Sequence, residues 1–490
     1  MKLGPLLQRL PGAVLFGDPE QEISAVGHDS RSLHHGALFV AIRGAKSDGN
    51  QFVEQALRKG AAAIASEQAP REGATWIQVS DAREALALLS AALLGDPASA
   101  FQLVGVTGTN GKTTTTYLVE AALRAAGKET GLIGTIQYRI GARAHEAVRT
   151  TPESSDLQAL FKEMKDAGCS HVVMEVSSHS LQLKRVHGCA FQAAVFTNLT
   201  RDHLDFHGDM DSYFAAKKVL FEAYLKHDGV AVLNADDERS EALAAATRAR
   251  VIRYGFRENA DVRATDVQLS IEGSRFRAKT PLGDFAVDSP LLGRFNVENL
   301  LAALAAAIGL GLDPAQALKG ILSVTGVPGR MERVFAGQDF AIIVDYAHTD
   351  DALRNLLETV RGLQPRRVIT VFGCGGDRDK TKRPLMGAVA SRLSDVIVVT
   401  SDNPRSEPPE AILEEILLGV NGGRGCERHV IVDRRDAIAR ALELARKGDA
   451  VVIAGKGHET YQELRDRQVP FDDRQVAREQ VARLLRSAKA

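Results

Sequence analysis

The segment from Thr107 to Thr114 constrains the fold of this chain most, because it reads Thr-Gly-Thr-Asn-Gly-Lys-Thr-Thr. The apolar run at 101–106 predicts a buried strand before it, and residues 115–126 favour a helix after it. A glycine turn between a strand and a helix N-terminus directs backbone N–H groups at an anion. The stricter P-loop pattern requires glycine where this chain has Val106, so the loop is a variant. The segment predicts a strand–loop–helix unit that binds ATP.

Two side chains of this loop have expected roles in phosphate chemistry. Lys112 would reach the terminal phosphates, and the hydroxyl of Thr113 would bind Mg²⁺. The alternative is a glycine turn that holds no ligand. The predicted phosphate cradle consists of Gly108, Thr109, Asn110, Gly111, Lys112, Thr113 and Thr114.

Length, charge and cysteine content favour a multi-domain cytoplasmic enzyme. A chain of 490 residues suggests about three domains. It carries 61 basic and 62 acidic residues, so we expect neither a nucleic-acid partner nor attraction to a membrane surface. We also expect no signal peptide and no transmembrane span. The four cysteines lie far apart without a C-x-x-C pair, which favours reduced thiols over disulfides or zinc.

Alternating strand and helix patterns predict an α/β fold with mostly parallel sheets, whose ligand sites lie at the carboxyl ends of strands. We expect a small N-terminal α/β domain at 1–97, a central P-loop-type ATPase domain at 98–327 and a C-terminal Rossmann-like domain at 328–490. Further strands are predicted at 37–42, 62–65, 76–79, 172–176, 193–197, 229–233, 341–344, 368–372, 396–400 and 450–454, with a β-rich stretch at 251–287. Helices are predicted at 51–59, 81–94 and 297–308.

Polar residues follow the two strands predicted after the loop. Glu175 ends the first, and a carboxylate at a strand end beside a P-loop is a natural Mg²⁺ ligand. Its alternative role is to cap the following helix. The second strand leads into a dense polar segment at 197–205 that includes Asn198 and His203, which suits a site better than a packed core. A lone histidine such as His203 more often makes a structural hydrogen bond.

Taken together, nine motifs resemble those of the Mur ligase family, whose members join amino acids to the UDP-muramoyl peptide precursor of peptidoglycan. Within the family the resemblance is to the group that adds the third amino acid. One departure is Asp350, where the family usually has proline; either residue suits a first helical turn. The motifs lie, in the expected order, at 108–113, 175–179, 198–207, 213–221, 296–299, 329–332, 345–349, 372–379 and 455–459.

The resemblance implies an ATP-dependent ligase that forms an amide bond. The D-glutamate carboxylate of UDP-MurNAc-L-Ala-D-Glu would attack the γ-phosphoryl group of ATP, and the amine of meso-diaminopimelate would displace phosphate from the acyl phosphate. Two Mg²⁺ ions and a CO₂-derived carbamate on Lys217 are implied. The alternative for Lys217 is an ordinary surface lysine beside Lys218. The implied catalytic residues are Lys112, Lys217, His203 and Asn198.

The resemblance also assigns the two nucleotide ends. Asn296 and Asn299 would approach adenine, although either could instead cap the alanine-rich helix. Arg330, Asp345 and His348 would line the nucleotide side of the C-terminal domain. Residues implied to contact the UDP-linked precursor are His28, Ser30, Lys46, Ser47, Thr150, Thr151, Ser177 and Arg185; taken alone, those of the first domain are typical turn residues.

The acceptor amino acid is inferred from Asp402-Asn403-Pro404-Arg405, after the strand at 396–400. Diaminopimelate differs from lysine by a distal carboxylate, which a planar guanidinium reads through two parallel hydrogen bonds. Relatives with Asp-Asn-Pro-Arg look diaminopimelate-specific. The alternative is a proline turn with a solvated arginine. The implied diaminopimelate-binding residues are Arg378, Asp402, Asn403, Pro404, Arg405, Gly455 and Glu459.

Three other functions stay open at this point. They are a lysine-adding ligase of the same group, a folylpolyglutamate synthase-like ligase, and a P-loop ATPase switch that ligates nothing. We expect a monomer in a bacterial cytoplasm.

Overall fold

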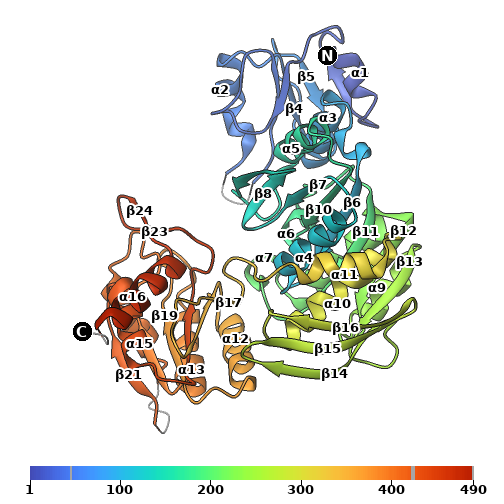
Figure 1. Ribbon diagram of the computed structural model, residues 1–490. Coiled ribbons are helices and arrows are strands. Elements are labelled where there is room, and N and C mark those ends of the chain that lie inside the picture. Colours follow the sequence, from blue (N-terminus) through green and yellow to red (C-terminus); the bar gives the residue numbers. More distant parts are fainter. Residues whose placement is uncertain (45–46, 421–424, 488–490) are drawn as a thin grey trace. The chain divides into compact units, whose positions relative to one another are not determined.

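The computed structural model, drawn in Figure 1, describes residues 1–44, 47–420 and 425–487. Its chain divides into two compact units. The first unit comprises Met1–Arg263, Thr280–Gly283 and Glu298–Ser323. The second comprises Ala264–Lys279, Asp284–Val297 and Val324–Ala490.

The N-terminal part of the first unit is a five-stranded sheet of order β1-β5-β4-β3-β2. Alternation along its strands sends Leu38 and Val40 into one core and Phe39 into the other, as a period of two requires. Asp81 caps α3 by accepting bonds from two backbone N–H groups. The elements are α1 (Leu3–Leu7), β1 (Val14–Phe16), β2 (Ala25–Gly27), β3 (Ala37–Val40), η1 (Gly49–Phe52), α2 (Val53–Arg58), β4 (Ala63–Ser66), β5 (Trp76–Gln78), α3 (Ala82–Leu93) and η2 (Pro97–Ala100).

The central sheet has the order β16-β15-β14-β13-β12-β11-β6-β10-β7-β8-β9. Strand β6 pairs in parallel with β10 on one side and with β11 on the other, so their carboxyl ends lie together. The β7–β8 and β8–β9 pairs are antiparallel, which makes the sheet mixed. The strands are β6 (Gln102–Thr107), β7 (Thr130–Ile133), β8 (Gln137–Ile140), β9 (Arg143–Glu146), β10 (His171–Glu175), β11 (Phe191–Phe196), β12 (Leu225–Asn234), β13 (Arg250–Gly255), β14 (Val262–Ser270), β15 (Gly273–Thr280) and β16 (Gly283–Ser289).

The helix after the phosphate loop begins at Lys112, three residues before the predicted start. Gly111 adopts φ 85° at its N-cap, and the Thr115 N–H bonds the Gly111 carbonyl to close the first turn. Thr113 and Thr114 are β-branched and have a slightly lowered helix propensity, so the sequence is a poor guide to where this helix begins. The helices are α4 (Lys112–Ala125), α5 (Ser154–Asp166), α6 (Ser178–Gln182), α7 (Leu204–His207), α8 (Met210–Val219), the π-helix η3 (Leu220–Tyr224), α9 (Ser240–Ala246), α10 (Arg294–Gly309) and α11 (Pro314–Leu322).

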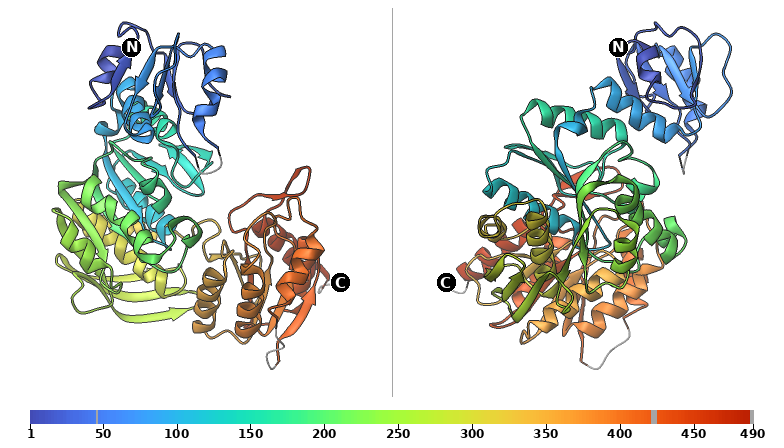
Figure 2. Two further views of the ribbon diagram at one scale, coloured as in Figure 1. Left: turned by 180° about the vertical axis from the view of Figure 1, so that it is seen from behind. Right: turned by 90° about the vertical axis from the view of Figure 1, so that its right-hand side faces the viewer.

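The second unit contains a six-stranded sheet of order β17-β18-β22-β19-β20-β21 with helices on both faces (Figure 2). One core packs α12, α13 and α14 on the sheet, and the other packs α15 and α16. Asp350 opens α12 after the N-cap Thr349, so the departure from proline is accommodated in the first turn. The elements are β17 (Glu332–Arg333), β18 (Ala341–Asp345), α12 (Asp350–Gly362), β19 (Val368–Phe372), α13 (Lys382–Leu393), β20 (Val396–Val399), α14 (Pro409–Leu417), β21 (Glu427–Val430), α15 (Arg434–Leu444), β22 (Ala450–Ala454), β23 (Tyr461–Glu463), β24 (Gln468–Pro470) and α16 (Asp473–Ser487).

The predicted strands and helices are present with shifts of a few residues at their ends. All four cysteines are free thiols, as the sequence indicated. Among the described helices, none is both long and apolar enough to cross a membrane.

A buried ion pair joins α15 and α16 in the second unit. Arg434 donates Nε and Nη2 to the two carboxylate oxygens of Asp473 at 2.8 and 2.7 Å, and both side chains are fully buried. Arg435 and Glu479 form a second pair between the same helices, but at the surface. The two pairs therefore differ in burial within one helix–helix contact.

We expect Asp473→Ala to lower the free energy of unfolding of the second unit by about 3–5 kcal/mol, because it leaves a buried guanidinium without its partner. Glu479→Ala should leave stability almost unchanged, because its charge is hydrated. Hydrogen exchange of α15 and α16 is the suitable measurement, since the single tryptophan, Trp76, lies in the first unit. Equal loss of protection in both variants would contradict this account.

Candidate active site

The phosphate loop is held by the loop that follows β11. The Thr109 N–H bonds the Asn198 carbonyl at 2.8 Å, and the Asn110 N–H bonds Asn198 Oδ1 at 2.9 Å. Gly108 has φ 147°, and a Cβ there would collide with Thr197 and Asn198. Only glycine therefore lets the two loops approach so closely. Asn198, predicted as catalytic, braces the phosphate loop in this structure.

Two lysines converge on the same loop. Lys112 Nζ donates to the carbonyls of Gly108 and Thr109 at 3.0 and 2.8 Å. Lys217 Nζ, on α8, donates to the Gly108 carbonyl at 2.8 Å and lies 4.3 Å from the ring centroid of Tyr213. The sequence already placed Lys112 in the phosphate loop, whereas Lys217 reaches this loop only through the fold.

Lys217 is almost completely buried, with 1% of its surface exposed. Burial, reinforced by the positive charge of Lys112, holds the pKa of Lys217 well below its usual value. Its neighbour Lys218 is instead a partly exposed residue paired with Glu222. The alternative of an ordinary surface lysine is therefore wrong for Lys217 and correct for Lys218.

Glu175 is fully buried at the end of β10. Its carboxylate accepts bonds from the Thr135 N–H at 2.8 Å and from the Thr135 hydroxyl at 3.1 Å. The helix that follows is capped by Ser177, which accepts from the Ser180 N–H. Helix capping, the alternative for Glu175, is thus wrong, and the sequence gave no indication of Thr135.

His203 belongs to a histidine cluster that sequence reasoning missed. His179 makes edge contacts with the rings of His203 and His207, at centroid separations of 4.8 and 5.4 Å. Burial lowers the pKa of His203, and it lowers that of His179 to about 4. Burial thus favours the neutral form of His179 and His203, and a neutral imidazole can accept a proton. The spacing of His203 and His207 on one short helical turn was the available signal.

Among the residues that the structure describes, no group of three histidine, cysteine, aspartate or glutamate side chains is arranged to hold a metal ion. The oxygen atoms of Thr113 and Glu175 are nevertheless of the kind that Mg²⁺ prefers. Mg²⁺ is commonly held by one or two carboxylates together with substrate phosphates and water. The donor set fits such a shared site better than an all-protein cage.

The two asparagines near α10 have different environments. Asn299 Oδ1 accepts from the Thr115 hydroxyl at 3.2 Å and lies close to Gly111, beside the phosphate loop. Asn296 is the third residue of α10, and its Nδ2 donates to the Leu292 carbonyl at 2.8 Å. Neither side chain is at the N-cap position, and their contact with adenine stays a prediction.

In the second unit, Arg330, Asp345 and His348 lie around the end of β18. Asp345 accepts from the Met331 and Ala347 N–H groups, and burial raises its pKa although Arg330 opposes this. The Arg330 guanidinium stacks 5.0 Å from the Tyr346 ring centroid. The structure thus brings together the three residues predicted for the nucleotide side of this unit.

The precursor residues that the structure describes in the first domain each have a different partner. Ser30 is buried and donates to Gln55, whereas His28 contacts the Ser155 hydroxyl on α5 at 3.4 Å. Ser47 is exposed and accepts from the Gly44 N–H, and Lys46 lies outside the described residues.

The remaining precursor residues cluster at the ends of β10 and its neighbours. Thr151 Oγ1 donates to the Glu175 carbonyl at 2.8 Å and lies 3.4 Å from Ser177 Oγ. Arg185 Nη1 donates to the Thr151 carbonyl at 3.1 Å, and the Thr150 hydroxyl contacts that of Thr135. Of the residues assigned to the precursor, Thr151 thus bonds Glu175 directly, and Thr150 shares the partner Thr135 with it.

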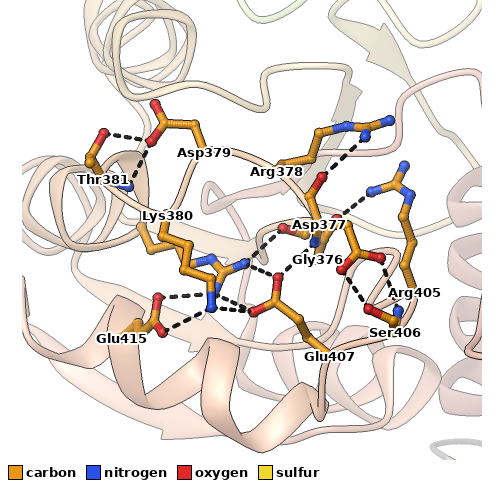
Figure 3. Close-up of polar contacts among 12 residues, drawn as sticks. Gly376, Asp377, Arg378, Asp379, Lys380, Thr381, Arg405, Ser406, Glu407 and Glu415 are labelled. Atoms are coloured by element: carbon orange, nitrogen blue, oxygen red, sulfur yellow. Dashed lines mark hydrogen bonds and ion pairs between the residues drawn. The ribbon is translucent and has the colours of Figure 1, made fainter. Parts of the chain in front are cut away.

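The predicted amino-acid loops form one assembly in the second unit. Figure 3 shows the guanidinium groups of Arg378 and Arg405 on the same side of their loops. A Cβ at Gly375 would lie 2.9 Å from Arg405 Nη1 and 3.8 Å from Arg378 Cγ, so both arginine side chains pass close to this glycine. Arg405 is 24% exposed and donates to the Gly376 carbonyl. The alternative of a solvated arginine is therefore wrong.

A fully buried arginine beneath these loops was not predicted. Arg383 on α13 pairs with Glu407 at 2.9 Å and with Glu415 at 2.9 Å, and it donates to the Gly375 carbonyl. Hydrogen bonds from Arg383 hold the pKa of Glu407 well below its usual range. Figure 3 labels the two partners of Arg383, Glu407 and Glu415. The network fixes the backbone of the loops that carry Arg378 and Arg405.

Asn403 connects the loop at 402–405 with the loop at 455–459, which were both predicted to bind the amino acid. Its Nδ2 donates to Glu459 at 3.0 Å, and its Oδ1 accepts from the buried ammonium of Lys456 at 2.9 Å. Asp402 lies close to Gly455, which has φ 116°. Pro404 follows directly and its carbonyl abuts Gly376. The sequence analysis did not assign Lys456 to the site, although this lysine lies between Gly455 and Gly457 in the motif at 455–459.

Comparison with known proteins identifies three matching segments. Residues 22–93 match the Mur ligase family catalytic domain, 106–307 the Mur ligase middle domain, and 329–457 the Mur ligase glutamate ligase domain. The chain is 51% identical, over 98% of both chains, to the UDP-N-acetylmuramoyl-L-alanyl-D-glutamate–2,6-diaminopimelate ligase of Solibacter usitatus.

Two solved structures extend the comparison. A structure of UDP-N-acetylmuramoyl-L-alanyl-D-glutamate–2,6-diaminopimelate ligase has a TM-score of 0.72 at 34% identity, covering 99% of this chain and 100% of that one. A folylpolyglutamate synthase from Mycobacterium tuberculosis has a TM-score of 0.59 at 20% identity and covers 81% and 93%, which shows a shared fold alone. The predicted fold of three α/β domains is confirmed. The boundaries at 97/98 and 327/328 stay predictions.

We expect Gly108→Ala to weaken nucleotide binding about tenfold or more, because the added Cβ forces the two loops apart. Gly127→Ala is the matched control, since Gly127 also has positive φ but has no neighbour within 4 Å of an added Cβ. Titration with a fluorescent ATP analogue measures both. Equal affinity in the two variants would refute the close-approach argument.

Proposed function

This chain belongs to the Mur ligase family, and we propose that it adds meso-2,6-diaminopimelate to UDP-N-acetylmuramoyl-L-alanyl-D-glutamate at the expense of ATP. The observation that carries the proposal is the pair Arg378 and Arg405, which flank Gly375. Its support is that relatives identical at about half of all positions over the full length bear that name. The chemistry is peptidoglycan synthesis.

The first chemical step joins the γ-phosphoryl group of ATP to the D-glutamate carboxylate and releases ADP. The loop 108–114, with Lys112, would cradle the phosphates through its N–H groups and ammonium. Asn198 and Asn299 would hold the loop in this shape, because each bonds or abuts it. Such positioning and charge stabilisation supply most of the catalysis in phosphoryl transfer.

The second step forms the amide. The amine of diaminopimelate attacks the acyl carbon, phosphate leaves, and the amine gives up one proton. His203 is our candidate to receive it, because burial lowers the pKa of this imidazole and favours its neutral form. The precursor peptide would be held beside Glu175 by Thr150, Thr151, Ser177 and Arg185. Its UDP end would be held by His28, Ser30, Lys46 and Ser47.

Metal and carbamate belong to the proposal as well. Thr113, Glu175 and a carbamate on Lys217 would hold two Mg²⁺ ions, which would neutralise charge on the migrating phosphoryl group. Carbamate formation requires an uncharged amine, and burial favours one at Lys217 because it holds the pKa of this lysine well below its usual value. The rest of ATP would be bound by Asn296, Asn299, Arg330, Asp345 and His348. Asp402, Asn403, Pro404, Gly455 and Glu459 would complete the diaminopimelate site with the two arginines.

A guanidinium reads the distal carboxylate that lysine lacks, so the Arg378–Arg405 pair favours diaminopimelate over the lysine alternative. The likeness to folylpolyglutamate synthase concerns the fold alone. An ATPase switch that ligates nothing would have no carboxylate substrate for these two arginines to bind. The proposal extends to a monomer in the bacterial cytoplasm, where four free thiols are expected.

The direct test is phosphate release from ATP by purified protein with Mg²⁺ and UDP-MurNAc-L-Ala-D-Glu. We expect release with meso-diaminopimelate and a tripeptide product seen by mass spectrometry, and little release with L-lysine. Release with lysine alone would overturn the specificity. Release indifferent to both amino acids, without a new product, would instead support the ATPase switch.

We expect ¹³C-bicarbonate to label Lys217 and to give a carbamate resonance in carbon NMR. The low pKa should let the label persist at a lower pH than an ordinary lysine would allow, because the amine stays uncharged there. Lys217→Arg should remove the resonance and the activity, whereas Lys218→Arg should preserve both. A resonance retained in Lys217→Arg would refute the assignment.

A further inference from the structure

The hairpin formed by β23 and β24 is docked on the loop that carries Arg405. Gln462 Nε2 donates to the Asp402 carbonyl at 2.5 Å, and the Glu463 N–H donates to Asn403 Oδ1 at 3.0 Å. In the other direction, the Arg405 N–H donates to the Glu463 carbonyl at 3.1 Å. The hairpin therefore packs directly against the loop at 402–405 of the proposed diaminopimelate site.

The guanidinium of Arg405 is held at two places. Its Nε lies 2.6 Å from Glu463 Oε2, and its Nη1 donates to the Gly376 carbonyl at 2.9 Å. A guanidinium carries five N–H donors in a planar fork. Glu463 and Gly376 therefore occupy only part of the fork, and the terminal nitrogens retain donors for a second carboxylate.

The backbone of Arg405 is fixed by the same hairpin. Its φ of 51° lies in the left-handed region, which residues other than glycine adopt at a cost. The hydrogen bond from its N–H to Glu463 helps to offset that cost. One residue of the hairpin thus constrains both the main chain and the side chain of Arg405.

We propose that Glu463 is a specificity-determining positioning residue, which holds the Arg405 guanidinium in the orientation that binds the distal carboxylate of diaminopimelate. The inference rests on the proposed function. Glu463 acts through Arg405 and would not itself touch the reacting atoms. Its contribution should therefore appear in the use of diaminopimelate and not in the use of ATP.

A competing role for Glu463 has the opposite sign. If its carboxylate occupied the place of the substrate carboxylate, its removal would improve the use of diaminopimelate. The geometry favours positioning, because Glu463 lies at the Nε edge while Gly376 anchors Nη1. Each of the two groups contacts a different nitrogen of the guanidinium, so together they fix its orientation.

The test is Glu463→Gln in the full-length protein, with kcat/KM measured for diaminopimelate, L-lysine and ATP by product mass. We expect kcat/KM for diaminopimelate to fall about tenfold, as for loss of one charge-assisted contact. The values for ATP and for residual lysine use should be unchanged. Asp466→Asn, an exposed carboxylate in the turn of the same hairpin, is the matched control and should resemble the parent protein.

The same substitution in an Arg405→Ala background separates positioning from a general structural effect. If Glu463 acts through Arg405, Glu463→Gln should have little further effect there. An equal loss in both backgrounds, an equal loss for ATP, or a gain in diaminopimelate use would overturn the inference. A parent protein that makes no diaminopimelate adduct would overturn the proposed function itself, and this inference with it.

Discussion

The parallel pairing of β6 with both β10 and β11 is the constraint on which the central site depends. It brings the phosphate loop, Glu175 and Asn198 to one edge of the sheet, although they are separated by up to ninety positions in the chain. The backbone hydrogen bonds of a parallel ladder fix this register, and the buried strand residues on both faces prevent a slip. The close packing of Gly108 on the loop after β11 follows directly from that register.

Burial then changes the chemistry of side chains that are ordinary in sequence. Lys217 and Lys218 are adjacent on α8, yet only Lys217 is directed beneath the phosphate loop, where water does not stabilise its charge. Burial likewise distinguishes the two ion pairs between α15 and α16, because Arg434–Asp473 is buried and Arg435–Glu479 lies at the surface. In each case two neighbouring residues of one type have different properties because a helix presents them to different surroundings.

The second unit builds its site differently, from loops fixed by buried charged groups. Arg383 fastens the loops of Arg378 and Arg405 from below, and Lys456 ties Asn403 to Glu459. Arg434 also donates to the carbonyls of Ser401 and Ala454, just before Asp402 and Gly455. Such networks hold guanidinium groups rigidly, which planar recognition of a carboxylate requires.

The sequence by itself determined the strand–helix alternation, the phosphate loop, the free cysteines and the motifs that place the chain in its family. These features are local, because period-two and helical patterns, glycine turns and motif spacing are properties of short segments. It did not reveal Thr135 behind Glu175, the histidine cluster, or Glu463 beside Arg405. Those contacts join residues far apart in the chain or on a short hairpin without a distinctive pattern. Only the tertiary structure decided them, because burial, pKa and side-chain partners depend on which segments the sheets bring together.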